Sequence, residues 1–217
     1  MNTKGVVVVD YGMGNVLSVS RAIEHCGGTV HLTSAPADIV TADRLVLPGV
    51  GAFRDCVDAL AQRGLIEPIL KFSRQERPFL GICVGMQVLF ERGEEFESSP
   101  GLGLIPGTVI QIATEKTGGG VRKIPHIGWT TLKPPRDLGS AYWHNTILAR
   151  TEPNDSFYFV HSFTAVPTNP NHLLAVADYE GFAVTAAVRS DNITGCQFHP
   201  EKSGACGLNL IEQYLCS

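Results

Sequence analysis

An apolar run that ends on a cysteine between two glycines constrains the fold of this 217-residue chain most. Residues 78–87 read P-F-L-G-I-C-V-G-M-Q, which predicts a strand, a tight turn and a helix, with the thiol of Cys83 on the turn. This is the cysteine counterpart of the strained G-x-S-x-G elbow. A thiol at a helix N-terminus feels the positive end of the helix dipole, which favours the reactive thiolate. A free cysteine is also commonly a small buried hydrophobe, so both interpretations stay open here.

The first half of the chain alternates strand and helix patterns. Apolar runs predict strands, and the segments between them carry apolar residues at helical spacing, as with Val16, Val19 and Ile23. Such alternation predicts an α/β fold with a doubly wound, mostly parallel mixed sheet flanked by helices. The predicted strands are 6–9, 29–33, 44–47 and 79–82, and the predicted helices begin at 16, 53 and 65.

The second half is richer in strand patterns, and a helix at 207–215 closes the chain. The glycine-rich segment 115–121 is predicted to be a mobile loop, because glycine-rich chain costs most to order. Neither a linker nor a repeat interrupts the pattern, so residues 1–217 are predicted to form a single domain. The predicted strands are 108–112, 129–132, 156–160, 174–178, 183–188 and 193–198.

Composition excludes several classes of function. A net charge of −4 without a Lys/Arg cluster gives no support for binding nucleic acid or an anionic membrane. No stretch approaches the roughly 20 apolar residues of a membrane span, and the N-terminus lacks a signal-peptide pattern. We therefore expect a cytoplasmic protein with reduced thiols at its six cysteines. No C-x-x-C occurs, so neither a metal nor a cofactor is expected.

A second motif, Q-F-H-P-E at 197–201, supplies partners for the thiol. Pro200 biases His199 toward an extended conformation, in which His199 and Glu201 project to the same side. Alone, H-P-E is also typical of a polar turn. Together with Cys83 at the mouth of a parallel sheet, it predicts a Cys-His-Glu triad in which the carboxylate orients the imidazole and the imidazole activates the thiol.

Acyl chemistry through a thioester also needs donors for an oxyanion. The backbone N–H of Val84 is one candidate, and the segment Gly49, Val50 and Gly51 offers a second. The flanking glycines would let the peptides around Val50 flip, so the oxyanion hole could stay unformed until a partner binds. An ordinary strand-to-helix turn is the alternative interpretation of P-G-V-G at 48–51.

These motifs together resemble the class I (triad) glutamine amidotransferase family, which has a flavodoxin-like fold. More narrowly, four motifs resemble the glutaminase subunits of imidazole glycerol phosphate synthase, an enzyme of histidine biosynthesis. The resemblance runs from Val7 to the C-terminal helix and implies one glutamine amidotransferase type 1 domain over 1–217. The four motifs are D-Y-G-M-G-N at 10–15, P-H-I-G-W at 125–129, F-V-H-S-F at 159–163 and H-P-E-K-S-G at 199–204.

The resemblance implies that Cys83 attacks the side-chain amide of glutamine, giving a glutamyl thioester and ammonia. It implies that His199 shuttles protons and that Glu201 orients His199. The family's substrate-binding positions correspond to Gln87, Glu95 and Ser162.

Two further features of the resemblance concern single side chains. Phe163 stands where many relatives carry tyrosine, which removes a hydroxyl from this position. His126 and His161 are interpreted as structural histidines without a catalytic role.

The resemblance also implies a partner, a (βα)8-barrel cyclase subunit that forms a heterodimer with this chain and receives ammonia through an internal channel. The cyclase would form imidazole glycerol phosphate and aminoimidazole carboxamide ribotide. The implied interface residues are Asp10, Tyr11, Gly12, Asn15 and Lys202.

Two alternatives remain from the sequence alone. The first is a glutaminase serving another acceptor, such as the pyridoxal phosphate or anthranilate systems. The D-Y-G-x-G-N start argues against it, and so does Met86, where the anthranilate type usually has histidine. The second is a cysteine hydrolase or a binding module on the same fold. The intact elbow, base and acid argue against a binding module.

Overall fold

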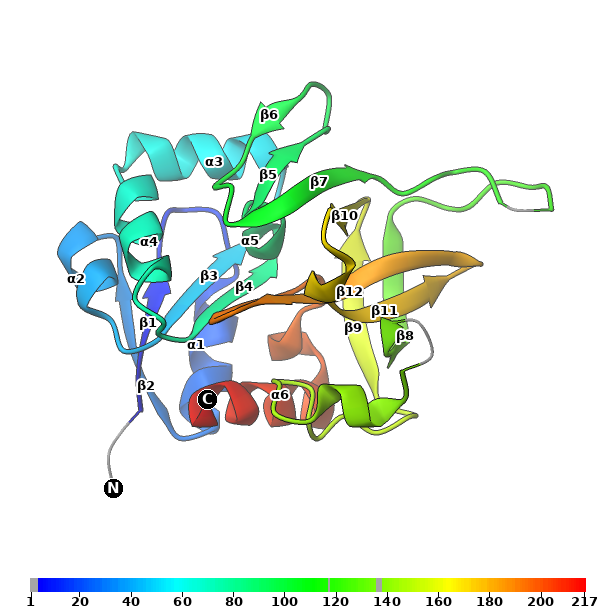
Figure 1. The fold of residues 1–217 in the computed structure, drawn as a ribbon. Coiled ribbons are helices and arrows are strands. Elements are labelled where there is room, and N and C mark those ends of the chain that lie inside the picture. The colour runs from blue at the N-terminus through cyan, green and yellow to red at the C-terminus, as the bar shows by residue number, and fades with distance from the viewer. Residues whose placement is uncertain (1–3, 117, 136–137) are drawn as a thin grey trace.

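A computed structural model describes residues 4–116, 118–135 and 138–217, which form two β-sheets with helices around them (Figure 1). The larger sheet has nine strands, and its spatial order is β2-β1-β3-β4-β13-β12-β11-β8-β9. In that order the strands are Gly28–Thr33, Lys4–Val9, Leu45–Gly49, Phe79–Cys83, Ile193–Cys196, Phe182–Ser190, Leu173–Tyr179, His126–Lys133 and Ser156–His161.

In the larger sheet, parallel pairing joins β2, β1, β3, β4 and β13. The remaining strands of this sheet, β12, β11, β8 and β9, pair antiparallel. Every residue of β3 and β4 is buried, as the uninterrupted apolar runs predict for strands covered on both faces. Helices α1 (Val16–His25) and α6 (Gly204–Cys216) contact each other on one face, and α2 (Pro36–Thr41) and α4 (Ile66–Ser73) on the other. The predicted α/β fold with a mixed sheet flanked by helices is confirmed.

A smaller sheet has the order β10-β7-β5-β6 and lies beside α3 (Phe53–Gln62). Its strands are Phe163–Pro167, Ile105–Gln111, Phe90–Gly93 and Ser99–Pro100. Short 3-10 turns complete the described elements at Ser140–Trp143, Pro170–His172 and Pro200–Lys202, the last labelled η4. The sequence patterns miss β5, β6, β10 and α2, because these elements are short and lack a regular apolar repeat.

The helix predicted after Cys83 is only one turn long: α5 spans Val84–Gln87. The carbonyl oxygens of Val88 and Leu89 accept hydrogen bonds from Leu102 and Ile105 instead of continuing the helix. A four-residue helix carries few aligned peptide dipoles, so the dipole contributes less to a thiolate at Cys83 than a long helix would.

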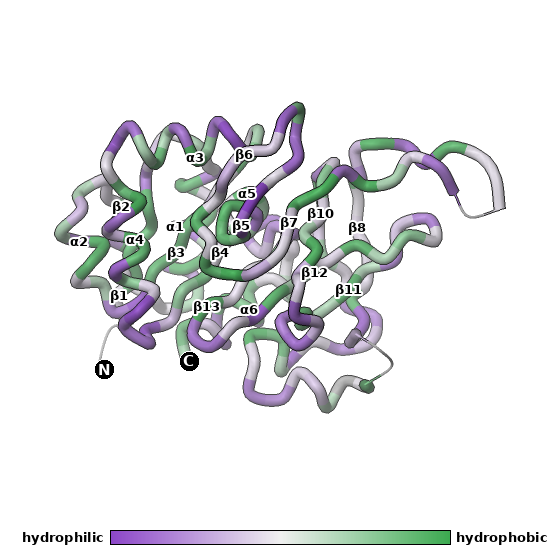
Figure 2. The backbone as a smooth tube through the Cα atoms, turned by 45° about the horizontal axis from the view of Figure 1, so that its top comes forward, coloured by the Kyte–Doolittle hydropathy of each residue, from purple (hydrophilic) through white to green (hydrophobic). Residues whose placement is uncertain are grey.

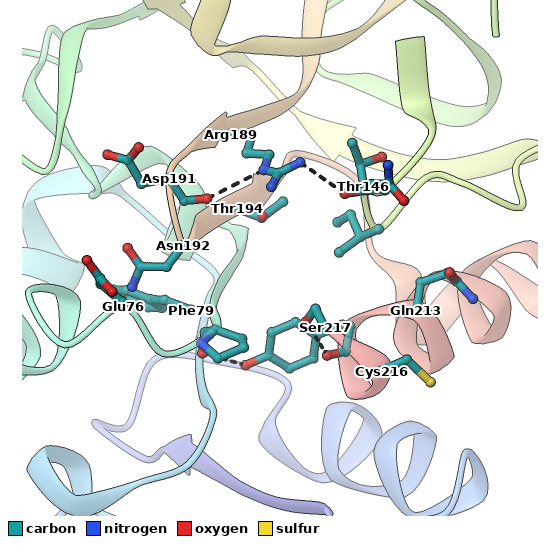
Figure 3. Close-up of a pocket in the computed structure, with 14 residues that line it drawn as sticks. Glu76, Phe79, Thr146, Arg189, Asp191, Asn192, Thr194, Gln213, Cys216 and Ser217 are labelled. Carbon is teal, nitrogen blue, oxygen red and sulfur yellow. Dashed lines mark hydrogen bonds between the residues drawn. The ribbon is translucent and has the colours of Figure 1, made fainter. Parts of the chain in front are cut away.

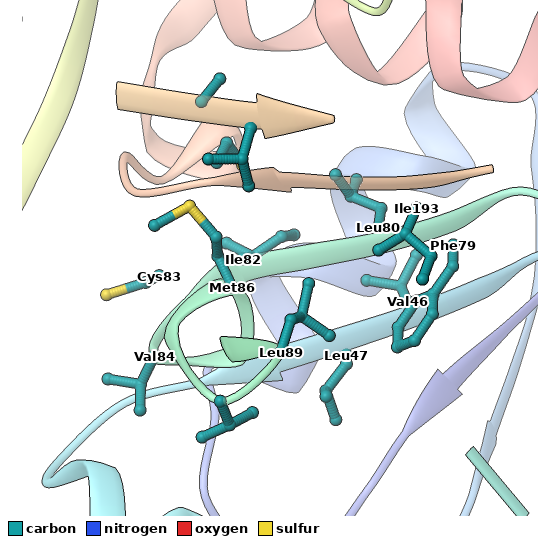
Figure 4. Close-up of a cluster of buried hydrophobic side chains, with 14 of the residues drawn as sticks. Val46, Leu47, Phe79, Leu80, Ile82, Cys83, Val84, Met86, Leu89 and Ile193 are labelled. Carbon is teal, nitrogen blue, oxygen red and sulfur yellow. The ribbon is translucent and has the colours of Figure 1, made fainter. Parts of the chain in front are cut away.

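The core fills the space between the sheet and its helices. Hydrophobic stretches follow the central strands, and hydrophilic stretches gather toward the periphery (Figure 2). Around β3, β4 and α5, buried aliphatic and aromatic side chains pack together, and Cys83 lies at the margin of this cluster (Figure 4). Within the described residues, no helix is long and apolar enough to cross a membrane.

The loop predicted to be mobile, 115–121, includes position 117, which lies outside the described residues. The remainder forms a turn in which Glu115 and Val121 make an isolated bridge, and Lys116 N–H donates to Gly120 O at 3.1 Å.

Candidate active site

Cys83 ends β4 in a backbone conformation that residues other than glycine rarely adopt, with φ 55° and ψ −117°. Close packing explains the glycines on either side. A Cβ on Gly85 would overlap the carbonyl oxygen of Leu47, and a Cβ on Gly81 would lie 2.8 Å from the carbonyl oxygen of Gly85. The structure therefore has the strained elbow that the G-x-C-x-G pattern predicts.

His199 and Glu201 form a buried pair. Nδ1 of His199 lies 2.8 Å from Oε1 of Glu201, and the two side chains are 3% and 1% exposed. Pro200 follows His199, whose backbone is extended as predicted. The N–H of His199 donates to the carbonyl oxygen of Tyr158 in β9, and the Ser203 hydroxyl donates to the carbonyl oxygen of His199. These contacts fix the pair relative to β9 and the start of α6.

The second ring nitrogen of His199, Nε2, is buried without a hydrogen-bond partner among the described residues. Burial lowers the pKa of His199, but the neighbouring Cys83 sulfur and the Glu201 carboxylate outweigh burial and raise the pKa to about 9. Both neighbours therefore favour the protonated form of the ring. An imidazolium beside the sulfur stabilises negative charge on it and can give a proton to a leaving group.

A cavity of about 320 Å³ opens onto these groups. The sequence predicted ten residues for catalysis, the oxyanion hole and substrate binding. Eight of them line this cavity, all except Gly49 and Glu201. Sequence reasoning gave no site role to the other four lining residues, although it did note His161 and Phe163. The lining residues are Val50, Gly51, Cys83, Val84, Gln87, Glu95, Pro125, Val160, His161, Ser162, Phe163 and His199.

The candidate oxyanion donors lie on both sides of the sulfur. Val84 opens α5, and the first N–H groups of a helix have no acceptor within it. Gly51 adopts a left-handed φ of 101°. Gly49 is required by packing, because a Cβ there would lie 2.8 Å from the Tyr11 hydroxyl and would crowd the backbone of Gly85. Of the two glycines beside Val50, only Gly51 has an unusual backbone conformation.

Gln87 turns its amide nitrogen inward. Its Nε2 donates to Gln197 Oε1 at 2.8 Å and to the carbonyl oxygen of Phe163 at 3.3 Å, which leaves the amide oxygen for a ligand. Glu95 is half-buried rather than fully solvated, since one carboxylate oxygen accepts the N–H of Phe53 at the start of α3. Ser162 lines the cavity and accepts the N–H of Ile112 with its carbonyl oxygen.

The histidines interpreted as structural form a chain beside the cavity. Nδ1 of His126 lies 2.9 Å from Nε2 of His161, and Nδ1 of His161 lies 2.7 Å from the carbonyl oxygen of Phe163. Thr130 lies 3.0 Å from Nε2 of His126. Burial lowers the pKa of each histidine to about 4, so both rings are neutral at pH 7.

Acid is expected to destabilise the fold through this pair. The folded-state pKa values lie below the usual value of about 6.5, so the unfolded chain binds more protons between about pH 6.5 and 4, and stability falls as pH drops through that window. For His161 alone, the loss between pH 7 and 5 is on the order of 2 kcal/mol. Urea denaturation at both pH values measures it. His161→Gln should flatten the difference, whereas His144→Gln, on the exposed surface, should not.

The residues predicted to contact a partner differ in exposure. Lys202 is exposed, with its ammonium 5.9 Å from the centre of the Tyr158 ring, and Gly12 is exposed in the turn after β1. Asp10 and Asn15 are half-buried in the same turn. Tyr11 presents almost no side-chain surface to a partner: its side chain is 1% exposed, and its hydroxyl donates to the carbonyl oxygen of Pro48. It supports the segment before Val50 from within the core.

Another cavity, of about 400 Å³, lies at the amino end of β4 and is lined by Arg189, Asn192 and Gln213 among others (Figure 3). No histidine lines it, so it offers no base of the kind found beside Cys83. Across the described parts of the chain, no group of three or more His, Cys, Asp or Glu side chains could hold a metal ion.

The chain is similar to known proteins over nearly its whole length. The family model described as "Glutamine amidotransferase class-I" matches residues 7–213. A Legionella pneumophila (strain Paris) protein named imidazole glycerol phosphate synthase subunit HisH 1 is 49% identical over 210 residues, covering 97% of this chain and 98% of that protein. The HisH subunit of Syntrophotalea carbinolica is 43% identical, over 96% of this chain and 98% of its own length.

Solved structures share the fold at low sequence identity. PurLQS from Thermotoga maritima superimposes with a TM-score of 0.68 at 20% identity, over 100% of this chain and 98% of that one. A Thermoplasma acidophilum protein, described with its structure as a "putative gmp synthase subunit a protein", gives a TM-score of 0.68 at 18% identity, over 100% and 94% of the two chains. The full-length sequence matches show that the chain belongs to the class-I glutamine amidotransferase family, among the HisH subunits of imidazole glycerol phosphate synthase.

Proposed function

We propose that this chain hydrolyses glutamine to glutamate and ammonia as the glutaminase subunit of imidazole glycerol phosphate synthase. The observation that carries the proposal is the elbow cysteine, Cys83, in one cavity with His199, whose other ring nitrogen is bound by Glu201. The similarity to HisH subunits over nearly the whole chain supports ammonia supply for histidine biosynthesis rather than for another acceptor.

In the proposed reaction, the Cys83 sulfur attacks the amide carbon of glutamine, and the carbonyl electron pair moves onto oxygen. The N–H of Val84, with a second donor from residues 49–51, holds this oxyanion. The C–N bond then breaks as His199 gives its proton to the leaving nitrogen, which leaves as ammonia. Next, water loses a proton to His199 and attacks the thioester. The C–S bond then breaks, Cys83 returns to a thiolate, and the new side-chain carboxylic acid loses its proton to solvent to give glutamate.

The proposed substrate contacts follow from the groups left available in the cavity. The amide oxygen of Gln87 and the carboxylate of Glu95 suit the ammonium of glutamine, because both accept hydrogen bonds. The hydroxyl of Ser162 suits the carboxylate of glutamine, to which it can donate. Phe163 contributes its backbone carbonyl, which already receives two hydrogen bonds, and offers no hydroxyl.

The proposed partner is a (βα)8-barrel cyclase that forms a cytoplasmic heterodimer with this chain, in which residues 1–217 act as a single domain. Free ammonia in water would mostly be protonated and lose its nucleophilicity, so an internal channel to the cyclase would preserve it. Exposed aromatic surface beside the triad supports docking there. Trp129 is 57% exposed, and its ring packs edge-on to Tyr158, over which Lys202 lies.

Docking is expected to raise glutamine hydrolysis at least about tenfold, and more when the cyclase also holds its phosphoribulosyl-formimino substrate. The physical reason is that the backbone at Gly51 has an unusual conformation and can change when a partner binds. Glutamate release measured for the chain alone, with cyclase, and with cyclase plus substrate tests this. Full activity of the isolated chain would contradict the gating. Activation by a pyridoxal phosphate or anthranilate synthase instead would reassign the acceptor.

A further inference from the structure

Besides His199, a second side chain contacts the sulfur of Cys83. Nε2 of Gln197 lies 3.7 Å from Sγ of Cys83. Gln197 is completely buried, in the segment between β13 and His199. A buried side-chain amide against a sulfur atom calls for an explanation, because such a polar group is costly to bury without a partner.

The orientation of this amide follows from its neighbours. The carbonyl oxygen of Phe163 can only accept, so Gln87 must present its NH2 group there. The same NH2 group donates to Gln197 at 2.8 Å, so the amide oxygen of Gln197 faces Gln87. The NH2 group of Gln197 is therefore the part that faces the sulfur of Cys83.

A second row of hydrogen bonds, through two histidines, ends on the same carbonyl oxygen of Phe163. Nδ1 of His161 must donate to the carbonyl oxygen of Phe163, so its Nε2 accepts from Nδ1 of His126, and Nε2 of His126 accepts from the Thr130 hydroxyl. Two directed rows of hydrogen bonds thus meet at Phe163. Rotating the amide of Gln197 by half a turn would place two NH2 groups against each other and leave a buried donor unpaired.

We propose that Gln197 is a positioning residue for the nucleophile, donating an N–H hydrogen bond to the sulfur of Cys83 that favours the thiolate and fixes it for attack. A thiol sulfur is a weak acceptor, whereas a thiolate is a charged one, so the bond strengthens when the proton leaves. This donor is distinct from the oxyanion donors, since it points at the sulfur. The inference rests on the proposed role of Cys83 as nucleophile, yet its test measures alkylation of the thiol and not glutamine hydrolysis.

Other ionisable groups also lie around Cys83 and its neighbours. They come from the turn after β1, from α3, from the segment after β5, and from β13 and the turn that follows it. All of them are unchanged in variants of Gln197, so a comparison of variants isolates the amide. They are His199, Glu201, Cys196, Cys56, Tyr11 and Glu95.

The test is the pH dependence of Cys83 alkylation by iodoacetamide, measured on the full chain by peptide mass spectrometry. Gln197→Met keeps the size of the side chain but removes the donor. It should raise the midpoint of the profile by about one pH unit, which slows alkylation about tenfold at pH values below both midpoints. Gln197→Glu, with a carboxylate toward the sulfur, should raise the midpoint further. The matched control is Gln213→Met. Gln213 lies on α6, outside the cavity of Cys83, so this substitution should leave the profile unchanged.

A profile of Gln197→Met that superimposes on that of the unmodified chain would overturn the proposal. A measurement without any variant covers the case in which the substitutions prevent folding. In the nuclear magnetic resonance spectrum, the side-chain NH2 protons of Gln197 should shift with the same midpoint as Cys83 alkylation. Resonances that stay constant through that midpoint would also overturn it. A shifted midpoint in a chain that never hydrolyses glutamine would support the positioning role while contradicting the proposed function.

Discussion

Replacing Cys83 with alanine is expected to abolish glutamine-dependent synthesis in the complex with cyclase, with a fall in kcat of at least about 10⁴-fold. The reason is that the alanine variant cannot form a thioester, and the remaining hydrogen-bond donors act on the oxygen of a carbonyl group that no thiolate attacks. Glutamate release, with cyclase and its substrate present, measures the loss. The cyclase reaction should still proceed when ammonium salt replaces glutamine, which would show that the complex is intact.

The matched control for this variant is Cys206→Ala, a half-buried cysteine in α6 away from the cavity. It should retain nearly full glutaminase activity. Loss of activity in both variants alike would point to a general effect of removing thiols. Activity of Cys83→Ala above a tenth of the unmodified level would contradict a covalent mechanism at this residue.

Alanine at Gly85 is expected to destabilise the fold by about 3 kcal/mol or more. A Cβ at this position would overlap the carbonyl oxygen of Leu47, which is backbone of the central strand β3 and cannot move aside alone. The midpoint of urea denaturation measures the effect. Glutaminase activity is expected to fall as well, because the same clash would disturb the turn that carries Cys83.

Gly5→Ala provides the comparison. The nearest atom to a Cβ at Gly5 is the carboxylate oxygen of Asp43 at 3.6 Å, an ordinary contact, so its midpoint should change little. If Gly85→Ala were as stable as Gly5→Ala, the close approach of α5 to β3 would not be the reason for glycine in the elbow.

The elbow and the His199–Glu201 pair could be predicted from sequence because their causes are local. Glycine spacing sets the turn at Cys83, and Pro200 sets the extended backbone at His199. The alternation of the first half likewise predicts the parallel strands, and the apolar runs of β3 and β4 are buried on both faces.

The contacts between distant segments could not be predicted in this way. Gln197 meets Gln87 across 110 positions, and no spacing in the chain signals an amide beside the sulfur. The same holds for Tyr11, which the resemblance places at a partner interface, whereas its hydroxyl donates to the carbonyl oxygen of Pro48 inside the core. The length of α5 was also out of reach, because distant backbone groups at Leu102 and Ile105 end it.

The central claim is that Cys83 alone forms the covalent bond with glutamine. Incubating the complex with an alkylating glutamine analogue and mapping the label by mass spectrometry tests it most directly. Our account predicts label on Cys83 alone among the six cysteines, with protection by added glutamine. Label spread over several cysteines, or none on Cys83, would contradict it.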